Sequence, residues 1–264
     1  MDEPAPWRGA AAYDAYVGRW SRVVARRFLD WLAVPAGSRW LDVGCGTGAL
    51  TEEVLRACAP ALVLGLEPSD PFVAGAAAYV RDRRAAFCRG SAQGLPVGDA
   101  SVDAVVSGLV LNFVPDRPAA LAEMRRVTRP GGVVAAYVWD YADGMQLIRH
   151  FWDAAVECDP AARPLDEGVR FPDCRPGSLA ELFTGADLHD VAVEEVVVPT
   201  RFVDFADYWA PFLGGAGPAP AYVASLDEDR RAALREALRA RVGVADDGSV
   251  HLTARAWAVR GRRP

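Results

Sequence analysis

One stretch, Trp40–Gly48, constrains the fold of this chain more than any other. An apolar segment that contains one acid leads into glycines at positions 44, 46 and 48, and Leu50, Val54 and Leu55 then recur at helical spacing. This order predicts a strand, a tight loop and a helix. Glycine has no Cβ, so a ligand can lie directly against such a loop, and the start of the following helix offers free N–H groups.

The glycines alone do not identify the ligand. Gly44, Gly46 and Ala49 satisfy the dinucleotide fingerprint G-x-G-x-x-G/A. Asp42 lies two residues before the first glycine, where the strand of a dinucleotide site is usually apolar. An acid at this place favours a ligand that carries a cationic group over a pyrophosphate.

A second acid lies at the matching place on the next predicted strand. Residues 62–67 read as a strand, and Glu67 ends it, 25 residues after Asp42 (67 − 42). In a βαβ nucleotide fold an acid at this position accepts hydrogen bonds from ribose hydroxyls. The glycine loop and Glu67 together are more specific than either feature alone.

The rest of the chain alternates predicted strands and helices, which indicates parallel βαβ units in a doubly wound α/β fold. Capping boxes are expected at Ser178 and Ser225, a loop over 159–177, and a turn at Arg129–Gly132 before the fifth strand. The expected helices are 13–31, 71–84, 118–127 and 145–158, and the expected later strands are 85–88, 101–107, 133–139, 191–198 and 251–259.

These features, taken together, resemble a known enzyme family. Asp42, Gly44, Gly46 and Gly48 fill the motif D/E-x-G-x-G-x-G of class I S-adenosylmethionine-dependent methyltransferases. Glu67, Leu95-Pro96, Ser101–Asp103 and Leu121–Gly132 follow in the order of the group related to ubiquinone and menaquinone biosynthesis. The resemblance covers roughly residues 35–140.

The resemblance implies a mostly parallel, seven-stranded, Rossmann-like sheet with S-adenosylmethionine as cofactor and S-adenosylhomocysteine as product. Residues 1–34 are expected to form a tail and cover helix, and residues 35–264 the methyltransferase domain. Residues 199–245, rich in aromatic side chains, are expected to form a helical insertion before the last strand that acts as a lid.

The family also implies roles for individual residues. The glycine loop, including Cys45, is expected to carry the methionine end, with Asp42 near its ammonium group and Glu67 on the ribose. The remaining contacts are expected from Pro68, Ser91, Ala92 and Gln93 around the adenine, from the backbone of Ser107, Gly108 and Leu109 near the sulfonium, and from Trp20 as a cover.

The sequence departs from the family pattern at two positions. Ser91 stands where relatives carry an Asp for the adenine amino group, and a hydroxyl is the weaker acceptor. Many relatives carry a His just after the fourth strand, whereas this chain has Asn112-Phe113. No convincing catalytic dyad is visible, and the weak candidates are Tyr16, Asn112 and Tyr141.

The expected reaction is methyl transfer to a small molecule by in-line displacement. We expect aromatic side chains to enclose an apolar or aromatic acceptor, although each of them can equally be core. They are Tyr16, Trp20, Phe113, Trp139, Tyr141, Phe202 and Trp209. Neither the acceptor, the methylated atom nor the oligomeric state follows from the sequence.

The composition and individual residues of the chain disfavour several other classes of function. A net charge of −6 disfavours RNA or membrane binding and hence a macromolecular methyltransferase. Five scattered cysteines without a C-x-x-C pair indicate reduced thiols in a cytoplasmic protein, and three isolated histidines suggest no metal site. A nicotinamide oxidoreductase is disfavoured by Asp42 and the Arg129–Gly132 turn. A non-methylating S-adenosylmethionine enzyme, such as a cyclase, remains an alternative.

Overall fold

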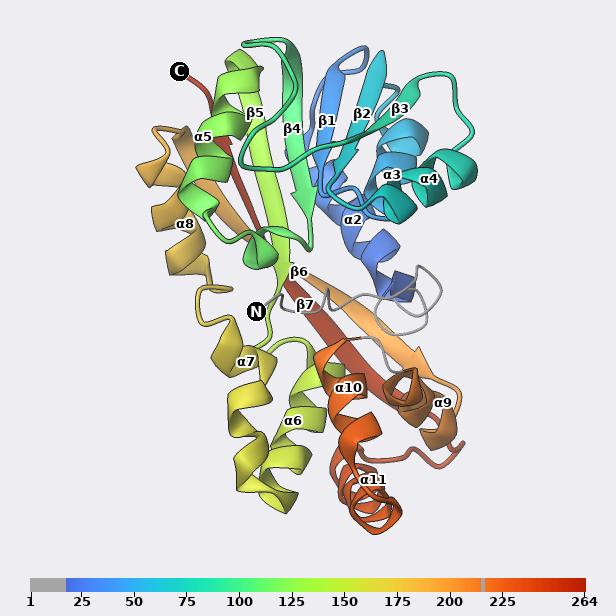
Figure 1. Cartoon of the computed structure of the whole chain (residues 1–264). Coiled ribbons are helices and arrows are strands. Elements are labelled where there is room, and N and C mark those ends of the chain that lie inside the picture. The colour runs from blue at the N-terminus through green and yellow to red at the C-terminus, as the bar shows by residue number, and fades with distance from the viewer. Residues whose placement is uncertain (1–17, 215–216) are drawn as a thin grey trace. The chain divides into compact units, whose positions relative to one another are not determined.

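The computed structural model describes residues 18–214 and 217–264, and its centre is a seven-stranded sheet of order β3-β2-β1-β4-β5-β7-β6 (Figure 1). β3, β2, β1, β4 and β5 pair in parallel. The strands are β1 Arg39–Val43, β2 Leu62–Glu67, β3 Ala85–Arg89, β4 Val102–Gly108, β5 Thr128–Trp139, β6 His189–Phe202 and β7 Val250–Arg262. The predicted mostly parallel, doubly wound sheet is confirmed.

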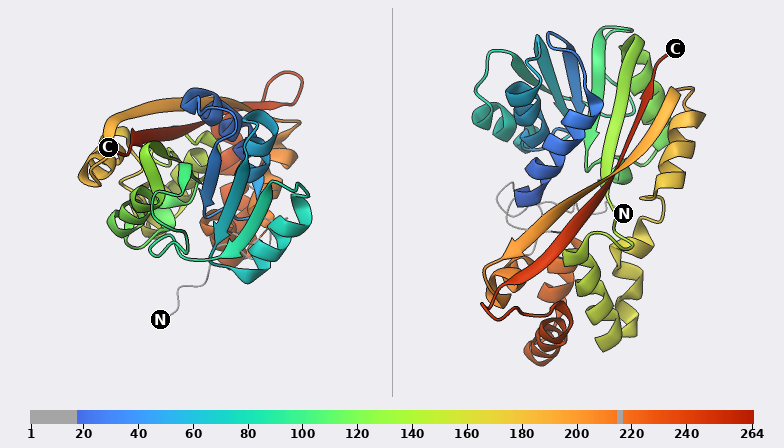
Figure 2. Two further views of the ribbon diagram at one scale, coloured as in Figure 1. Left: turned by 90° about the horizontal axis from the view of Figure 1, so that it is seen from above. Right: turned by 180° about the vertical axis from the view of Figure 1, so that it is seen from behind.

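β7 is an antiparallel member of the sheet. Gly131 N donates to Arg263 O at 2.8 Å near one end of β5, and Asp140 N donates to Arg255 O at 3.0 Å just past the other end. β6 and β7 lie side by side along their length (Figure 2).

The helices follow the predicted alternation with the strands. α4 packs on β2 and β3, and α5 packs on α8 (Figure 1). The α-helices are α2 Arg19–Leu32, α3 Ala49–Ala57, α4 Asp70–Tyr79, α5 Arg117–Val127, α6 Gln146–Cys158, α7 Glu167–Arg170, α8 Pro176–Gly185, α9 Phe205–Trp209, α10 Pro218–Ser225 and α11 Glu228–Val242. Short 3-10 helices are η2 Leu111–Phe113, η3 Pro160–Leu165 and η4 Ala210–Leu213. Within the described ranges, no helix is both long and apolar enough to span a bilayer.

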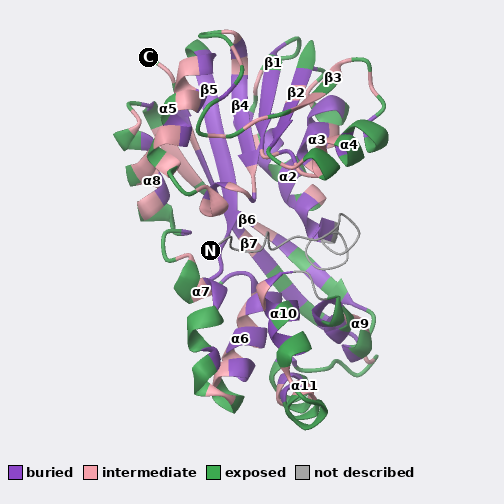
Figure 3. Ribbon diagram, viewed as in Figure 1, coloured by how far each residue is buried: buried purple, intermediate pink, exposed green. Residues whose placement is uncertain are grey.

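The chain forms two compact units. Unit 2 comprises Ser21–Val138, Asp173–Val196 and Ala256–Pro264, and unit 1 comprises Trp139–Pro172, Val197–Arg255 and the chain up to Trp20. In unit 2 the central strands β1 and β4 and residues 132–138 of β5 are largely buried (Figure 3), as is usual for parallel strands covered by helices, whereas the edge strand β3 is not. In unit 1 the core is aromatic: Phe151 stacks on Phe212 with ring centroids 4.5 Å apart.

The predicted turn at Arg129–Gly132 is wrong, because these residues lie within β5. The β4–β5 register passes from Val102↔Thr128 to Ala104↔Val133, so that two steps along β4 match five along β5. The segment is therefore a bulge in the strand. Gly131, with a φ of +74°, makes this bulge possible.

Several local predictions also fail for identifiable reasons. Pro176 starts α8, so Ser178 lies inside that helix and does not cap it. α11 is capped by Asp227, which accepts from Arg230 N, and Ser225 ends the preceding helix. The expected loop over 159–177 contains η3 and α7, each capped by an aspartate. The helix expected over 71–84 ends at Tyr79.

We expect Gly131→Ala to lower the free energy of unfolding by about 1–2 kcal/mol, because the left-handed region costs an L-residue roughly that much. An added Cβ at Gly131 meets nothing within 4 Å, so the cost is conformational and not steric. Gly98→Ala is the matched control: its added Cβ also meets nothing within 4 Å, and its φ lies outside the left-handed range. Chemical denaturation of both variants measures the difference, and equal stabilities would contradict a constrained bulge.

Candidate functional site

The glycine loop, residues 44–48, follows the carboxyl end of β1. The amides of Gly44 and Cys45 both donate to Leu66 O, at 2.7 and 3.0 Å, which fastens the loop to the end of β2. Gly44, Gly46 and Gly48 all have positive φ, at 76°, 52° and 87°. The loop therefore needs glycine at all three positions for conformational reasons.

Two of these glycines differ in what surrounds them. A Cβ on Gly44 would meet Val110 Cγ1 at 2.5 Å, so the loop packs directly against the segment that follows β4. A Cβ on Gly46 would meet nothing within 4 Å. The backbone at Gly46 therefore faces open space that a ligand can occupy.

Cys45 is a packing residue in this structure. Its thiol is buried, and a Cβ on Gly65 of β2 would approach Cys45 Sγ to 2.9 Å. Burial raises the pKa of the Cys45 thiol, and the neighbouring Asp42 and Glu67 add to this effect. The thiol is therefore protonated and unsuited to act as a nucleophile.

Glu67, at the carboxyl end of β2, lies against the glycine loop. Its Oε2 accepts from Gly46 N at 3.1 Å, and its Oε1 accepts from Ser69 N at 3.2 Å. Burial raises the pKa of Glu67, while these two backbone hydrogen bonds oppose the rise. The structure thus brings the two strongest sequence features, the loop and the second acid, into direct contact.

Asp42 is buried beneath the loop, with only 1% of its surface exposed. Thr51 Oγ1, from the first turns of α3, donates to Asp42 Oδ2 at 2.7 Å, whereas Oδ1 is buried without a hydrogen-bond partner. Burial raises the pKa of Asp42 to about 7. A cation bound nearby would favour the ionised form of this carboxyl group.

The segment after β4 forms a third side of the same region. Leu109 has a φ of +61°, and its amide donates to Tyr137 O at 2.8 Å. A Cβ on Gly108 would meet the Tyr137 hydroxyl at 2.6 Å, so this glycine is needed for close packing. Ser107 is buried, and Asn112 follows in η2.

The residues expected near the adenine lie on the surface of unit 2. Pro68, Ser91 and Gln93 are exposed, and Ala92 is half-buried. Ser91 Oγ accepts from Gln93 N at 3.2 Å, which folds this segment into a tight turn. Their contact with a cofactor stays a prediction.

Two residues predicted to line the site lie in unit 1 and not at these strand ends. Trp20 and Tyr141 belong to unit 1, where both are buried. Trp20 packs edge-on against Phe202 at 5.2 Å, and Tyr141 packs against Phe171 at 5.3 Å. Tyr16 lies outside the described residues.

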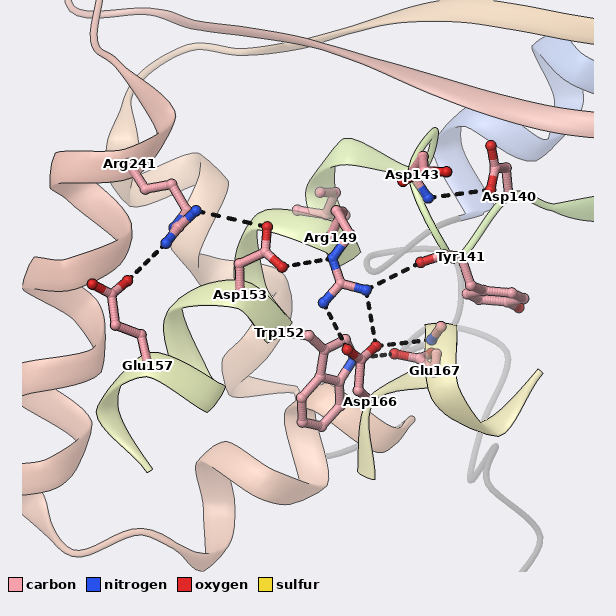
Figure 4. Close-up of polar contacts among 12 residues, drawn as sticks. Asp140, Tyr141, Asp143, Arg149, Trp152, Asp153, Glu157, Asp166, Glu167 and Arg241 are labelled. Atoms are coloured by element: carbon pink, nitrogen blue, oxygen red, sulfur yellow. Dashed lines mark hydrogen bonds and ion pairs between the residues drawn. The ribbon is translucent and has the colours of Figure 1, made fainter. Parts of the chain in front are cut away.

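A hollow of about 360 Å³ in unit 1 is lined mainly by charged side chains, and Figure 4 shows the ion pairs among them. Arg149 pairs with Asp166 at 2.7 Å and with Asp153 at 2.9 Å, while Arg241 pairs with Glu157 at 2.7 Å. These charged groups neutralise one another and tie α6 to α7 and α11. We therefore interpret this hollow as a structural ion-pair network and place the candidate site at the strand ends of unit 2.

Sequence reasoning missed Thr51, Val110 and Tyr137. Thr51 is fully buried in α3 between the apolar residues Leu50 and Val54, and a polar residue at that place was the available signal. Val110 shapes the site by packing closely against Gly44, and Tyr137 does so by packing closely against Gly108. No local pattern in the sequence reveals such contacts.

The arrangement fits an adenosyl amino acid cofactor. The backbone at Gly46 is open, the Glu67 carboxylate lies beside it, and Asp42 Oδ1, buried without a partner, would become ionised beside a bound cation. Carboxylates suit both ribose hydroxyls and an ammonium group.

Comparison with known proteins also finds methyltransferases. A family model described as a methyltransferase domain matches residues 41–136. A demethylmenaquinone methyltransferase of Roseiflexus sp. (strain RS-1) is 40% identical over 174 residues, covering 60% of this chain and 71% of the relative. A malonyl-[acyl-carrier protein] O-methyltransferase of Pectobacterium atrosepticum is 31% identical over 171 residues, covering 60% of this chain and 64% of the relative.

Solved structures share the fold. A phosphoethanolamine N-methyltransferase 2 of Haemonchus contortus, with phosphomonomethylethanolamine and S-adenosylhomocysteine bound, superposes with a TM-score of 0.59 at 15% identity. The match covers 96% of this chain and 56% of that one. The sheet order, the glycine loop and the 40% identical relative together show that the chain belongs to the class I S-adenosylmethionine-dependent methyltransferases.

Proposed function

We propose that this enzyme methylates a small apolar or aromatic molecule, with its cofactor held at the carboxyl ends of β1, β2 and β4. The observation that carries the proposal is the contact between Glu67 Oε2 and Gly46 N at 3.1 Å. Ligands of open α/β sheets bind at this edge, where the loops of neighbouring parallel strands meet.

In this proposal each strand end has its own task. Glu67 accepts the ribose hydroxyls, the loop at Gly44–Gly48 supports the methionine end, and Asp42 supplies negative charge from below. The adenine lies against Pro68 and Ala92, with Ser91 and Gln93 as polar partners. The backbone of Ser107–Leu109 borders the reacting methyl group.

S-adenosylmethionine, when bound, supplies an activated methyl group on a cationic sulfonium. The residues of this chain then have to orient the acceptor in line and exclude water, which can account for much of the acceleration. An amide such as Asn112 can orient an acceptor but cannot take its proton.

The small acceptor is supported by two kinds of observation. The two relatives described above are by name methyltransferases of demethylmenaquinone and of a malonyl group on its carrier protein. Unit 1 also carries linked aromatic rings, with Trp20, Phe202 and Tyr208 in successive contacts of 5.2 Å. None of the five cysteines forms a disulfide, which supports a cytoplasmic location for the enzyme.

The test of the function is methyl transfer from methyl-labelled S-adenosylmethionine to a panel of a reduced naphthoquinone, a malonyl thioester, RNA and protein. We expect label in a small-molecule product, with one S-adenosylhomocysteine formed for each methyl transferred. Label in RNA or protein would contradict the proposed acceptor class. Conversion of a small substrate without formation of S-adenosylhomocysteine would point to non-methylating chemistry such as cyclisation.

We expect Glu67→Gln to weaken binding of S-adenosylhomocysteine by about 1.5–3 kcal/mol, because charge-assisted hydrogen bonds become neutral ones. Asp82→Asn is the control, since Asp82 is an acid of the same unit whose partner is Arg84. Calorimetry measures both affinities, and thermal unfolding verifies that each variant is folded. An unchanged affinity in Glu67→Gln would remove Glu67 from the site.

We expect the affinity for S-adenosylhomocysteine to fall as the pH drops from 8 to 6. Burial raises the pKa of Asp42 to about 7. The carboxyl group is therefore ionised above that pH, when it attracts the ligand's ammonium group, and neutral below it. The change approaches tenfold per pH unit at most.

Asp42→Asn is expected to flatten this pH dependence while it keeps an acceptor for Thr51 Oγ1. Glu67→Gln keeps Asp42 and should therefore retain a pH dependence, with a lower midpoint because the Glu67 charge helps to raise the pKa of Asp42. Calorimetry at pH 6, 7 and 8 compares the variants. A slope that persists in Asp42→Asn would assign the titration to another group.

A further inference from the structure

Thr51 makes an unusual hydrogen bond for a threonine in a helix. It lies in the first turn of α3 and is fully buried. A helical threonine ordinarily donates to the carbonyl three or four residues before it, as Thr128 does to Met124 O at 2.7 Å at the end of α5. Thr51 Oγ1 instead donates to Asp42 Oδ2 of β1, also at 2.7 Å. Its one hydroxyl proton is therefore committed to the acid beneath the glycine loop.

This hydrogen bond joins the two elements that flank the glycine loop. β1 enters the loop and α3 leaves it, and nine residues separate Asp42 from Thr51 along the chain. Gly48, the N-cap residue of α3, has no side chain with which to accept from the first amides of the helix. Thr51 favours the charged form of Asp42 through its backbone amide as well as its hydroxyl.

A purely structural link between β1 and α3 would not need an acid. Asp42 Oδ1 is buried without a partner, and an unsatisfied oxygen costs stability that an apolar contact would avoid. Glu53, another buried acid of the same helix, shows the structural alternative, because it pairs with Arg26 and Arg56. Among the described residues Asp42 has only a neutral hydroxyl as its side-chain partner.

The groups around Asp42 act on its charge in opposite directions. Burial and the charge of Glu67, at the end of β2, disfavour the carboxylate, and Thr51 favours it. The neighbouring Cys45 thiol of the loop is protonated and adds no charge. The resulting pKa of Asp42 is about 7. The neutral and ionised forms are therefore close in free energy at neutral pH, and a single hydrogen bond shifts the balance between them.

We propose that Thr51 is a positioning residue of the cofactor site: its hydroxyl orients Asp42 and stabilises the ionised carboxylate that attracts the ammonium group of S-adenosylmethionine. Thr51 needs no contact with the ligand, because it acts through Asp42 Oδ2. The charge of Asp42 acts on the ammonium group through space, and buried surroundings weaken this attraction less than water does. The inference rests on the proposed function and adds to it the residue that keeps Asp42 charged.

The variant Thr51→Val removes the hydroxyl and keeps the shape of the side chain. Calorimetry on the full chain measures its affinity for S-adenosylhomocysteine at pH 6, 7 and 8.5. With the titration of Asp42 raised by about one pH unit, we expect a loss of affinity of about tenfold at pH 6, about fivefold at pH 7 and less than about twofold at pH 8.5. A merely structural role would weaken binding by the same factor at all three pH values.

Two further substitutions at position 51 separate the hydroxyl from the packing. Thr51→Ala also lacks the hydroxyl and should show the same pH-dependent loss, whereas Thr51→Ser keeps it and should restore the wild-type profile. Thr128→Val is the matched control, because Thr128 is equally buried and its hydroxyl makes a hydrogen bond of the same length. It should bind S-adenosylhomocysteine like the wild type at every pH. Thermal unfolding verifies that each variant is folded.

The dependence on Asp42 is tested by combining the substitutions. In an Asp42→Asn background, which has no charge to stabilise, Thr51→Val is expected to change the affinity by less than about twofold at every pH. A loss that is equal at all pH values, an unchanged affinity at pH 6, or a pH-dependent loss that persists in the Asp42→Asn background would overturn the proposal. Failure of the wild type to bind S-adenosylhomocysteine is a separate observation, and it would refute the proposed function itself.

Discussion

The candidate site depends on the way in which β2 holds the glycine loop of β1. Leu66 O accepts from two successive amides of the loop, and Glu67 accepts from a third. These hydrogen bonds fix the loop backbone in its left-handed conformations. They also place the Gly46 backbone beside the Glu67 carboxylate. The loop and the acid therefore form one hydrogen-bonded unit, although 21 residues separate Gly46 from Glu67.

The fold and the outline of the site could be predicted because they depend on local patterns. Three glycines after an apolar run, and an acid at the end of the next strand, are visible in the sequence, and the alternation of elements predicted the parallel sheet. The bulge at Gly131 could not be predicted, since it depends on hydrogen bonds with Arg263 at the far end of the chain. The cap expected at Ser178 failed because Pro176 starts the helix earlier.

Buried polar groups divide this protein into two kinds of interior. Around Arg149 in unit 1, opposite charges satisfy one another, and the network has little left to offer a ligand. At the strand ends of unit 2, Asp42 Oδ1 and the Asn112 amide are buried without partners. Unsatisfied groups cost stability, and a cation bound beside Asp42 would offset part of that cost.

The contact between Val110 and Gly44 limits how this enzyme can evolve. Val110 fills the space that a Cβ at position 44 would need, so a side chain at position 44 requires a smaller residue at position 110. The match to the methyltransferase family model runs through this contact and continues to residue 136. A change in the loop that precedes α3 therefore has to be accommodated by the segment that follows β4.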